Sequence, residues 1–504
     1  MTEFDPQRGI DFPVLEGRQS SMATGRAVFA DAARATDPEL AARTEATANW
    51  RKDYMAPVHD LVVSGMRAPD GTVQMCRDGL ASLYDRFTFT RDGRATGLAE
   101  AFETLTEPAF TTAEVVGTGR AVTELVIPYH GRALSGASLR HQLDVWVAND
   151  VVEPSFAEAI ALLIAHPEWL DLTGEDFAVL GAGAEMGPLA CLLDWGATVW
   201  AVDLPRPDMW RRIITDAEGR AGRLRVPVPA AGGLDRAQLT GSALAAVAGA
   251  DLLTQAPEVR TWLAEIDGPF VLGNYVYADG PLHVRVSLAI DAISMALLEQ
   301  GHDVMLAWLA TPTDVFATPM EAVEESRRRW RDAGIWRYAR SPLRLARQFQ
   351  PNYPDTVWTS NGVEYGVCDC LVNQQGPNYI LAKRLQRWRA MVAREDGVRV
   401  SLNVAPSTRT KSVVKNKALA AAYAGAGRFG LEIFEPDTSN AIMAALLVHD
   451  LRNPRSSANP QVPIAHPMQL FIDGACHGGL WRSEYAARSV LGLAAVAGMF
   501  ERNA

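Results

Sequence analysis

The residues from 177 to 203 constrain the fold more than any other stretch of the chain. They read FAVLGAGAEMGPLACLLDWGATVWAVD, in which two apolar runs flank a glycine-rich turn and a short helix-like segment. The second apolar run ends at an acidic residue, Asp203. Short apolar runs that alternate with helical segments are typical of buried parallel strands. The stretch therefore predicts a strand, a tight turn, a helix and a second parallel strand.

The same stretch predicts a nucleotide site. Glycines in the turn let a backbone approach a diphosphate, and the helix behind the turn offers unpaired N–H groups and the positive end of its dipole. Asp203 follows Gly183 by about twenty residues and can accept the hydroxyls of a ribose. The glycine spacing is G-x-G-x-x-x-G, so an α/β turn that binds nothing is the alternative. The predicted cofactor-binding residues here are Gly181, Gly183, Glu185, Met186, Gly187 and Asp203.

Composition narrows the class of protein. The chain has 504 residues, of which 48% are hydrophobic and 21% are charged, as expected for a soluble globular protein. A net charge of −11 argues against a nucleic-acid partner. No apolar run approaches the ~20 residues of a membrane span, and the N-terminus has no apolar core of a signal peptide. We therefore expect a cytoplasmic protein without a transmembrane segment.

The five cysteines are an odd, scattered set, which argues against a disulfide framework. Cys368 and Cys370 form a C-x-C pair without a second pair at zinc-finger spacing. We interpret them as two ordinary thiols and predict no metal site.

The pattern of apolar runs divides the chain. Residues 1–170 show few strand signals and are predicted to be a mainly helical N-terminal extension. Residues 171–504 alternate strand-like and helix-like segments, which predicts one α/β domain, a Rossmann-type doubly wound parallel sheet of about seven strands. The last of these strands is expected at Met468 to Ile472. A helical insertion is expected at about 320–375.

The insertion is rich in arginine. Eight arginines fall between Arg327 and Arg347, interleaved with Trp330, Trp336 and Tyr338. The simplest interpretation is a solvated helix pair whose aromatic side chains pack inward. The alternatives are a docking surface for an acidic carrier, a coenzyme A phosphate site, or an interfacial lid for a lipid-like substrate.

A Tyr-x-x-x-Lys pair, Tyr379 and Lys383, stands at the start of a predicted helix. Residues four apart lie on one helix face. A lysine ammonium beside a phenol lowers the pKa of the phenol toward neutrality, so the pair can act as acid or base. In isolation such a spacing is common and most instances are incidental.

The order of several motifs resembles the short-chain dehydrogenase/reductase superfamily over roughly residues 175 to 480. The glycine turn is similar to the family's Thr-Gly-x-x-x-Gly-x-Gly turn, and Tyr379 with Lys383 matches its catalytic pair. Three further matches are the adenine-contacting Asp, the Asn-Ala-Gly strand end and the Pro-Gly-x-x-x-Thr strand end beside the nicotinamide. The corresponding residues are Asp251 with Leu252, Gly273 with Asn274, and Asn403 to Pro406 with Thr410.

This chain departs from the family pattern at several places. Glu185 occupies the place of the middle glycine, and Ser407 follows Pro406 where glycine is usual. No serine precedes Tyr379 at the usual distance, so the resemblance assigns the serine role to Thr311, with Thr313 second. The helical Asn of the family is not evident, although Asp291 is nearby in the pattern.

The resemblance implies an NAD(P)-dependent oxidoreductase that interconverts a carbonyl and an alcohol. Asp203 favours NAD, because a carboxylate repels the extra phosphate of NADP, and the nearby Arg206 keeps NADP possible. The added regions suggest a medium-to-large, hydrophobic substrate, such as a lipid-like or polycyclic ketone or an acyl chain on a carrier. We expect a homo-oligomer. An S-adenosylmethionine-dependent methyltransferase and a non-catalytic dinucleotide-binding protein are the alternatives.

Overall fold

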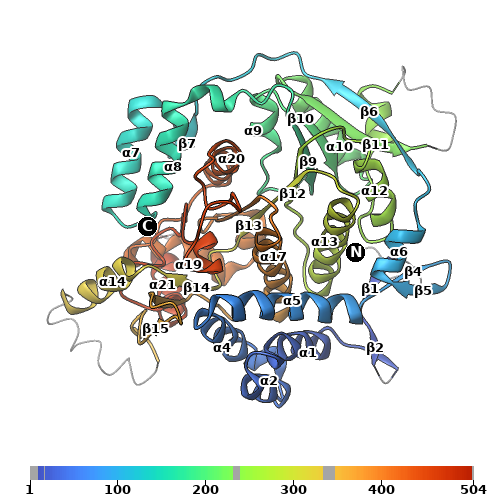
Figure 1. The fold of residues 1–504 in the computed structure, drawn as a ribbon. Helices are drawn as coiled ribbons and strands as arrows, with labels where there is room; N and C mark the ends of the chain where they lie inside the picture. Colours follow the sequence, from blue (N-terminus) through green and yellow to red (C-terminus); the bar gives the residue numbers. More distant parts are fainter. Residues whose placement is uncertain (1–8, 16, 231–238, 333–346, 502–504) are drawn as a thin grey trace.

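A seven-stranded sheet runs through the centre of the molecule (Figure 1). The structure is a computed structural model, and it describes residues 9–15, 17–230, 239–332 and 347–501. The strand order is β17-β13-β12-β9-β10-β11-β6. All neighbours in this sheet are parallel except β6, which is antiparallel to β11. The strands are β6 (Phe110–Val116), β9 (Asp176–Leu180), β10 (Thr198–Val202), β11 (Arg223–Pro229), β12 (Phe270–Asn274), β13 (Val304–Ala310) and β17 (Val400–Val404).

The topology confirms the predicted doubly wound α/β fold. The chain passes from β9 outward through β10 to β11, then returns to add β12, β13 and β17 on the other side of β9. The direction of winding therefore changes between β9 and β12. In open α/β sheets a ligand binds at this switch point, outside the carboxyl ends of the strands. The ends of β9 and β12 are thus the expected place for a site.

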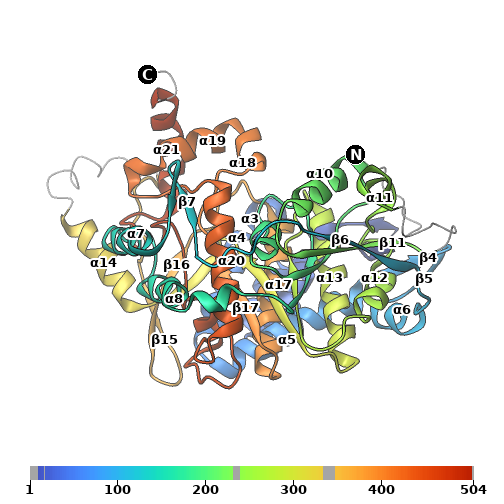
Figure 2. The same cartoon turned by 90° about the horizontal axis from the view of Figure 1, so that it is seen from above.

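Alternate strand residues enter two separate cores, one on each face of the sheet. In β9, Ala178 and Leu180 belong to the first core, whereas Phe177 and Val179 belong to the second. Figure 2 shows helices on both sides of the strands. The first face is covered by α12 (Ala256–Leu263), α13 (Pro281–Glu299) and α17 (Pro377–Glu395), and the second by α8 (Pro154–Ala165), α9 (Leu189–Asp194), α10 (Pro207–Glu218), α11 (Gly241–Val247) and α20 (Pro436–Arg452).

The N-terminal region packs against the first face. Its helices α1 (Ser21–Arg34), α4 (Met55–Met66) and α5 (Pro69–Arg86) share one core with α13 and α17. A Cβ at Gly79 of α5 would come within 2.6 Å of the Trp388 ring, so glycine is required where α5 meets α17. The N-terminal region also supplies β6 to the central sheet. The division of the chain near residue 170 stays a prediction.

One helix in the described part of the chain, α13, is long and apolar enough to cross a membrane. In this structure 72% of its apolar window is buried within the protein. It lies against β12, β13 and α17, as a core helix does.

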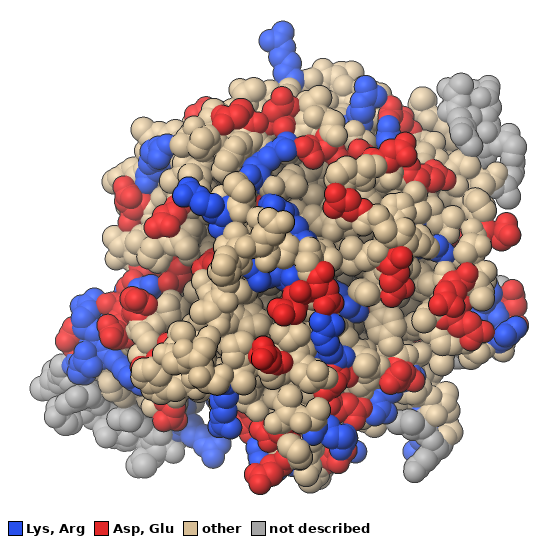
Figure 3. Space-filling model, viewed as in Figure 1, with Lys and Arg blue, Asp and Glu red and all other residues tan. Residues whose placement is uncertain are grey.

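Charged side chains of both signs are interspersed over the face of the molecule in Figure 3.

The predicted insertion contains a helix and a small second sheet. Helix α14 (Met320–Asp332) follows β14 (Val315–Thr318), which pairs with β16 (Glu364–Asp369), and β16 pairs with β15 (Thr356–Trp358). On α14, Glu325 accepts hydrogen bonds from Arg328 and Arg329. Trp336, Tyr338 and three of the eight arginines lie outside the described residues.

The strand expected at Met468 to Ile472 is wrong. These residues begin within a 3₁₀ helix, η4 (Pro467–Phe471), that lies against β17. Pro467 starts the turn, and the ring of His466 accepts a hydrogen bond from the Met468 N–H at 3.1 Å. Because Met468, Leu470 and Phe471 are all buried, the apolar run has no strand-like alternation.

A buried carboxylate ties three helices together. Asp291 of α13 accepts hydrogen bonds from the Arg389 guanidinium of α17 at 2.7 and 2.8 Å and from the Tyr84 hydroxyl of α5 at 2.8 Å. The Asp291 side chain is 2% exposed. Both oxygens of the Asp291 carboxylate are therefore engaged by partners within the core.

We expect Asp291→Ala to lower the free energy of unfolding by about 3–5 kcal/mol, because it leaves a buried guanidinium without its partner. Urea denaturation measures this difference. The matched control is Asp208→Ala on α10, whose side chain is 96% exposed, with an expected change within about 0.5 kcal/mol. Equal effects of the two substitutions would contradict the bridge.

Candidate functional site

The glycine turn after β9 is held against the end of β12. Gly181 has a φ of +92°, and a Cβ there would come within 2.8 Å of the Val276 backbone nitrogen. Beyond it, the N–H groups of Glu185, Met186 and Gly187 have no hydrogen-bond partner among the described residues. Consecutive unpaired N–H groups before a helix are a favourable environment for an anion such as a diphosphate.

Asp203, at the end of β10, is hydrogen-bonded to the glycine turn. One carboxylate oxygen accepts a hydrogen bond from the Gly183 N–H at 2.8 Å, and the other accepts one from the Leu204 N–H at 2.7 Å. Burial raises the pKa of Asp203, and these two hydrogen bonds oppose the shift. A carboxylate has about four lone-pair directions, so it can still accept ribose hydroxyls.

Glu185 stands in place of a family glycine, and its carboxylate is engaged elsewhere. It accepts a hydrogen bond at 2.8 Å from the N–H of Lys411, the first residue of α18 (Lys411–Lys415). Its backbone carbonyl accepts a second one, also at 2.8 Å, from Asn440 of α20. The carboxylate is therefore directed to an amide of a different segment. Thr410, which precedes this amide, lies beside the glycine turn.

Asp251 and Leu252 lie at the same edge of the sheet as Asp203, but a helix separates them from the preceding strand. The third strand of the α/β unit is β11, and α11 lies between β11 and Asp251, so Asp251 does not directly follow a strand. The N–H of Ala250 donates to the carbonyl oxygen of Asp203 at 2.9 Å, which places this segment beside the end of β10. The Asp251 carboxylate accepts the Leu253 N–H at 2.9 Å.

Asn274 ends β12, as predicted, and has a free donor. Its side-chain oxygen accepts a hydrogen bond from the Val276 N–H at 3.2 Å. Its Nδ2 is buried and has no partner among the described residues. A buried donor without a partner is costly unless a ligand satisfies it.

Two threonines follow β13. The hydroxyls of Thr311 and Thr313 lie 3.0 Å apart, and the Gln375 amide donates to the Thr313 carbonyl oxygen at 2.8 Å. Thr311 also lies close enough to the Tyr379 phenol to lower its pKa, against the effect of burial. Pro406 lies nearby, because the N–H of Ala405 donates to the Ala310 carbonyl at 3.0 Å. Thr311 and Pro406 therefore flank the start of α17.

An aromatic cluster surrounds Tyr379. The Tyr379 ring lies 6.3 Å from the Tyr277 ring and 5.5 Å from the His283 ring, centroid to centroid. His283 is 1% exposed, and its Nε2 has no partner among the described residues. Burial, with a contribution from Lys383, lowers the pKa of His283 to about 3. His283 was missed in the sequence, where the only signal is a histidine in the first turn of a largely apolar helix.

The ammonium of Lys383 has hydrogen-bond partners other than the phenol of Tyr379. It donates to the Leu309 carbonyl oxygen at 3.2 Å and to the Gln386 side-chain oxygen at 3.0 Å. Burial lowers the pKa of Lys383 to about 8, against the attraction of Asp314. Burial also raises the pKa of Tyr379 above its ordinary value. This direction is opposite to the one that the Tyr-x-x-x-Lys spacing predicts, because desolvation is the largest effect on the pKa of the phenol.

These positions gather at one edge of the sheet. The glycine turn, Asp203, Asn274 and Thr311 lie at the carboxyl ends of four adjacent parallel strands, β9, β10, β12 and β13. Tyr379, at the start of α17, reaches the same edge through its ring contact with Tyr277. The unpaired turn amides, the buried Asn274 donor and the Asp203 carboxylate fit a dinucleotide. Among the described residues no group of three or more His, Cys, Asp or Glu side chains could hold a metal ion.

Comparisons with known proteins add little. No family model matches the chain, and no curated protein matches it. One solved structure, a 3-oxoacyl-[acyl-carrier protein] reductase from Brucella melitensis, is 10% identical with a TM-score of 0.30. The match covers 61% of this chain and 90% of that chain. A resemblance this weak supports no conclusion about function.

The depressed pKa of Lys383 predicts a pH-dependent stability. The pKa is about 8 in the folded protein and ordinarily 10.5, so the unfolded chain binds more protons between these values and stability rises with pH across this window. Relative to Lys383→Met, the wild type should gain up to about 3 kcal/mol from pH 8 to pH 10.5. Urea denaturation across this range measures the gain.

The control is Lys417→Met, at an exposed position at the start of α19 (Lys417–Ala424). Its stability should follow that of the wild type across the same pH range. A pH-independent difference between wild type and Lys383→Met would show that the Lys383 amine is solvated in the folded protein.

Proposed function

We propose that the protein is an NAD(P)-dependent oxidoreductase that interconverts a carbonyl and an alcohol. The observation that carries the proposal is the loop after β12. Val276 packs on Gly181 at the glycine turn, and one residue later the Tyr277 ring contacts Tyr379. This loop links an anion-binding turn directly to an acid–base cluster, which is the combination that nicotinamide chemistry requires.

The bound cofactor would supply the hydride, and the side chains would bind, orient and protonate. The unpaired amides of Glu185, Met186 and Gly187 would hold the diphosphate, and Asp203 the ribose. The free amide donor of Asn274 faces the same edge and can satisfy a polar group of the cofactor. Lys383 would move toward the nicotinamide ribose from its present partners.

Tyr379 and Thr311 would act on the substrate. Both hydroxyls can donate hydrogen bonds to one carbonyl oxygen, and Tyr379 can pass its proton to that oxygen as the alcohol forms. Burial raises the pKa of the Tyr379 phenol, so this hydroxyl carries a proton at neutral pH and can act as the donor. The ring of His283 lies 5.5 Å from the Tyr379 ring, centroid to centroid, and its Nε2 has no partner among the described residues, so it could exchange a proton with this cluster.

The predicted preference for NAD rests on Asp203. The carboxylate lies at the end of β10 with both oxygens engaged by backbone amides, so it cannot easily turn away from a 2′-phosphate. Arg206 and Arg212 act on this carboxylate as the nearest cations, and they leave binding of NADP possible at lower affinity.

The cofactor is tested by thermal denaturation with NADH, NADPH and S-adenosylmethionine. We expect stabilisation by NADH, reaching about 2.7 kcal/mol at a hundredfold excess over its Kd. Asp203→Ala should lower the affinity for NADH at least about tenfold, which is about 1.4 kcal/mol of binding free energy. Asp208→Ala should leave this affinity unchanged. Stabilisation by S-adenosylmethionine alone would identify a methyltransferase instead.

Catalysis is tested by Tyr379→Phe with a panel of ketones and NADH. On any ketone that the wild type reduces, kcat should fall about 10²- to 10⁴-fold, because the proton donor is lost, while the Kd for NADH is unchanged. The control is Tyr277→Phe, whose hydroxyl bonds the exposed Asp279 at 3.0 Å. Wild-type binding of NADH without turnover of any ketone would indicate a non-catalytic dinucleotide-binding protein.

A further inference from the structure

The chain concentrates its lysines in one short segment. It contains five lysines, and three of them, Lys411, Lys415 and Lys417, fall within seven consecutive residues. All three are exposed, and their ammonium groups make no hydrogen bond or ion pair with another described residue. The carboxylate of Glu185 reaches this segment, but it accepts the backbone N–H of Lys411. In a protein with a net charge of −11, this segment is a local concentration of positive charge.

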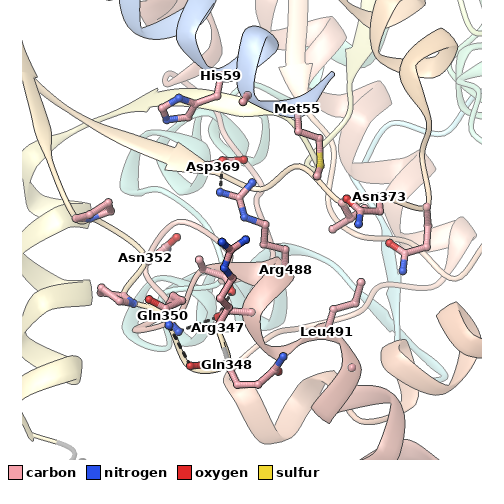
Figure 4. Close-up of a pocket in the computed structure, with 18 of the residues that line it drawn as sticks. Met55, His59, Arg347, Gln348, Gln350, Asn352, Asp369, Asn373, Arg488 and Leu491 are labelled. Atoms are coloured by element: carbon pink, nitrogen blue, oxygen red, sulfur yellow. Dashed lines mark hydrogen bonds and ion pairs between the residues drawn. The ribbon is translucent and has the colours of Figure 1, made fainter. Parts of the chain in front are cut away.

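Arginines of the same region are paired. Arg409, just before the lysines, lies 3.7 Å from the carboxylate of Glu435. Arg488 belongs to α21 (Ala487–Glu501), which packs on α19, and it lies 2.8 Å from the carboxylate of Asp369. Figure 4 shows this pair in the cleft beside the first turns of α21. The three lysines therefore differ from these arginines in having no carboxylate partner among the described residues.

Helix α18, which carries two of the lysines, has no buried residue. Val414 lies between the lysines and is 51% exposed. The next residue after α18, Asn416, caps α19, because its side-chain oxygen accepts the N–H groups of Ala418 and Leu419 at 3.2 Å each. Helix α18 therefore stands at the N-terminal end of α19. Lysines that flank an exposed apolar side chain are typical of helices that lie at a membrane surface.

Helix α21 runs antiparallel to α19. A Cβ at Gly498 would come within 2.0 Å of the Ala421 carbonyl oxygen, and a Cβ at Gly425 would come within 2.2 Å of the Ala494 carbonyl oxygen. Residue numbers thus rise along α19 as they fall along α21. The C-terminal end of α21 therefore lies next to the N-terminal end of α19, where Lys417 begins the helix.

Three apolar side chains are exposed at this end of α21. Val496 is 52% exposed, Met499 53% and Phe500 70%. Their spacing of three and four residues places them on one helix face, opposite the glycine contact with α19. Figure 2 shows this end of α21 projecting beyond the rest of the molecule. Cationic and apolar side chains therefore meet at one projecting end of the helix pair, which we call the basic end (residues 411–417 and 496–500).

The charge and shape of the basic end favour a particular kind of partner. A two-fold contact with a second copy would bring both sets of lysines together, and such a juxtaposition of like charges is costly. Two residues with opposite charges, Glu501 and Arg502, follow Phe500 in the sequence, and Arg502 lies outside the described residues. A stable protein interface needs about 800 Å² of well-packed surface on each partner, whereas single side chains of a projecting end can insert among lipid chains.

We propose that the basic end binds the surface of a membrane that contains anionic lipids. The ammonium groups of the three lysines are attracted to the anionic headgroups, and the exposed side chains of α21 enter the boundary between headgroups and acyl chains. The binding is peripheral and reversible, because no more than the last turns of one helix enter the bilayer. It does not depend on the proposed oxidoreductase function.

The test is co-sedimentation of the full chain with two kinds of vesicle, one of phosphatidylcholine alone and one of equal parts phosphatidylcholine and phosphatidylserine. We expect the affinity for the anionic vesicles to be at least about tenfold higher than that for the neutral ones. Raising the salt concentration from about 50 mM to about 500 mM should remove most of this difference, because it screens the lysines.

Two variants assign the binding to the basic end. The triple substitution Lys411→Gln, Lys415→Gln and Lys417→Gln should lower the affinity for anionic vesicles at least about tenfold. The double substitution Met499→Ser and Phe500→Ser should have an effect of similar size, although it leaves the charge unchanged. All five positions are exposed, so thermal denaturation should show that both variants fold as the wild type does.

Each variant has a matched control elsewhere on the surface. The triple substitution Arg43→Gln, Arg51→Gln and Lys52→Gln removes the same charge from exposed positions on α2 (Pro38–Glu45) and α3 (Trp50–Asp53). Trp358→Ser removes an apolar side chain of β15 that is 63% exposed. Both controls should bind anionic vesicles as the wild type does.

Four results would overturn the inference. The first is no binding to either vesicle, and the second is equal binding to both. The third is an equal loss of binding in the variants and their controls. The fourth is an oligomer, detected by light scattering, that Met499→Ser with Phe500→Ser dissociates, because a second copy then covers the apolar residues. Binding to poly-glutamate but to neither vesicle would assign the lysines to an acidic protein instead.

Discussion

The backbone at the end of β9 lies directly against the backbone at the end of β12, at a position where β9 is followed by a glycine. The rest of the site depends on this close backbone contact. The N–H of Tyr275 donates to the carbonyl oxygen of Leu180 at 2.9 Å, and Gly181 leaves room for Val276 against its Cα. Any side chain at Gly181 would also strain its positive φ. Because the two strand ends touch, the chain that leaves β12 passes from the glycine turn directly to Tyr379.

The position of Tyr379 is fixed from the opposite end of its helix as well. Helix α17 is clamped by α5, through Gly79 against Trp388, and by α13, through Asp291 and Arg389. The first of these contacts comes from the N-terminal region, which contributes no residue to the proposed chemistry. Helices α1 and α5 of the N-terminal region therefore help to hold this long helix over the sheet.

The features that could be predicted from the sequence are those that depend on a short stretch of neighbouring residues. Strand ends carry their own signals, so the glycine turn, Asp203, Asn274 and Thr311 could be placed from runs of apolar residues followed by a polar one. The η4 segment was misread because buried apolar runs look alike in strands and short helices. His283 and Tyr277 could not be found, because their importance arises only where β12, α13 and α17 converge in space.

Burial, rather than pairing of charges, sets the electrostatics of the cluster. The pKa of the acid Tyr379 is raised, and the pKa values of the bases Lys383 and His283 are lowered, so each neutral form is favoured. All three shifts have desolvation as their first cause, so these groups are less hydrated than groups at the surface of the protein. In such surroundings a hydrogen bond to a developing negative charge is stronger than in water. The hydroxyls of Tyr379 and Thr311 are therefore placed where they would stabilise charge on a substrate oxygen most strongly.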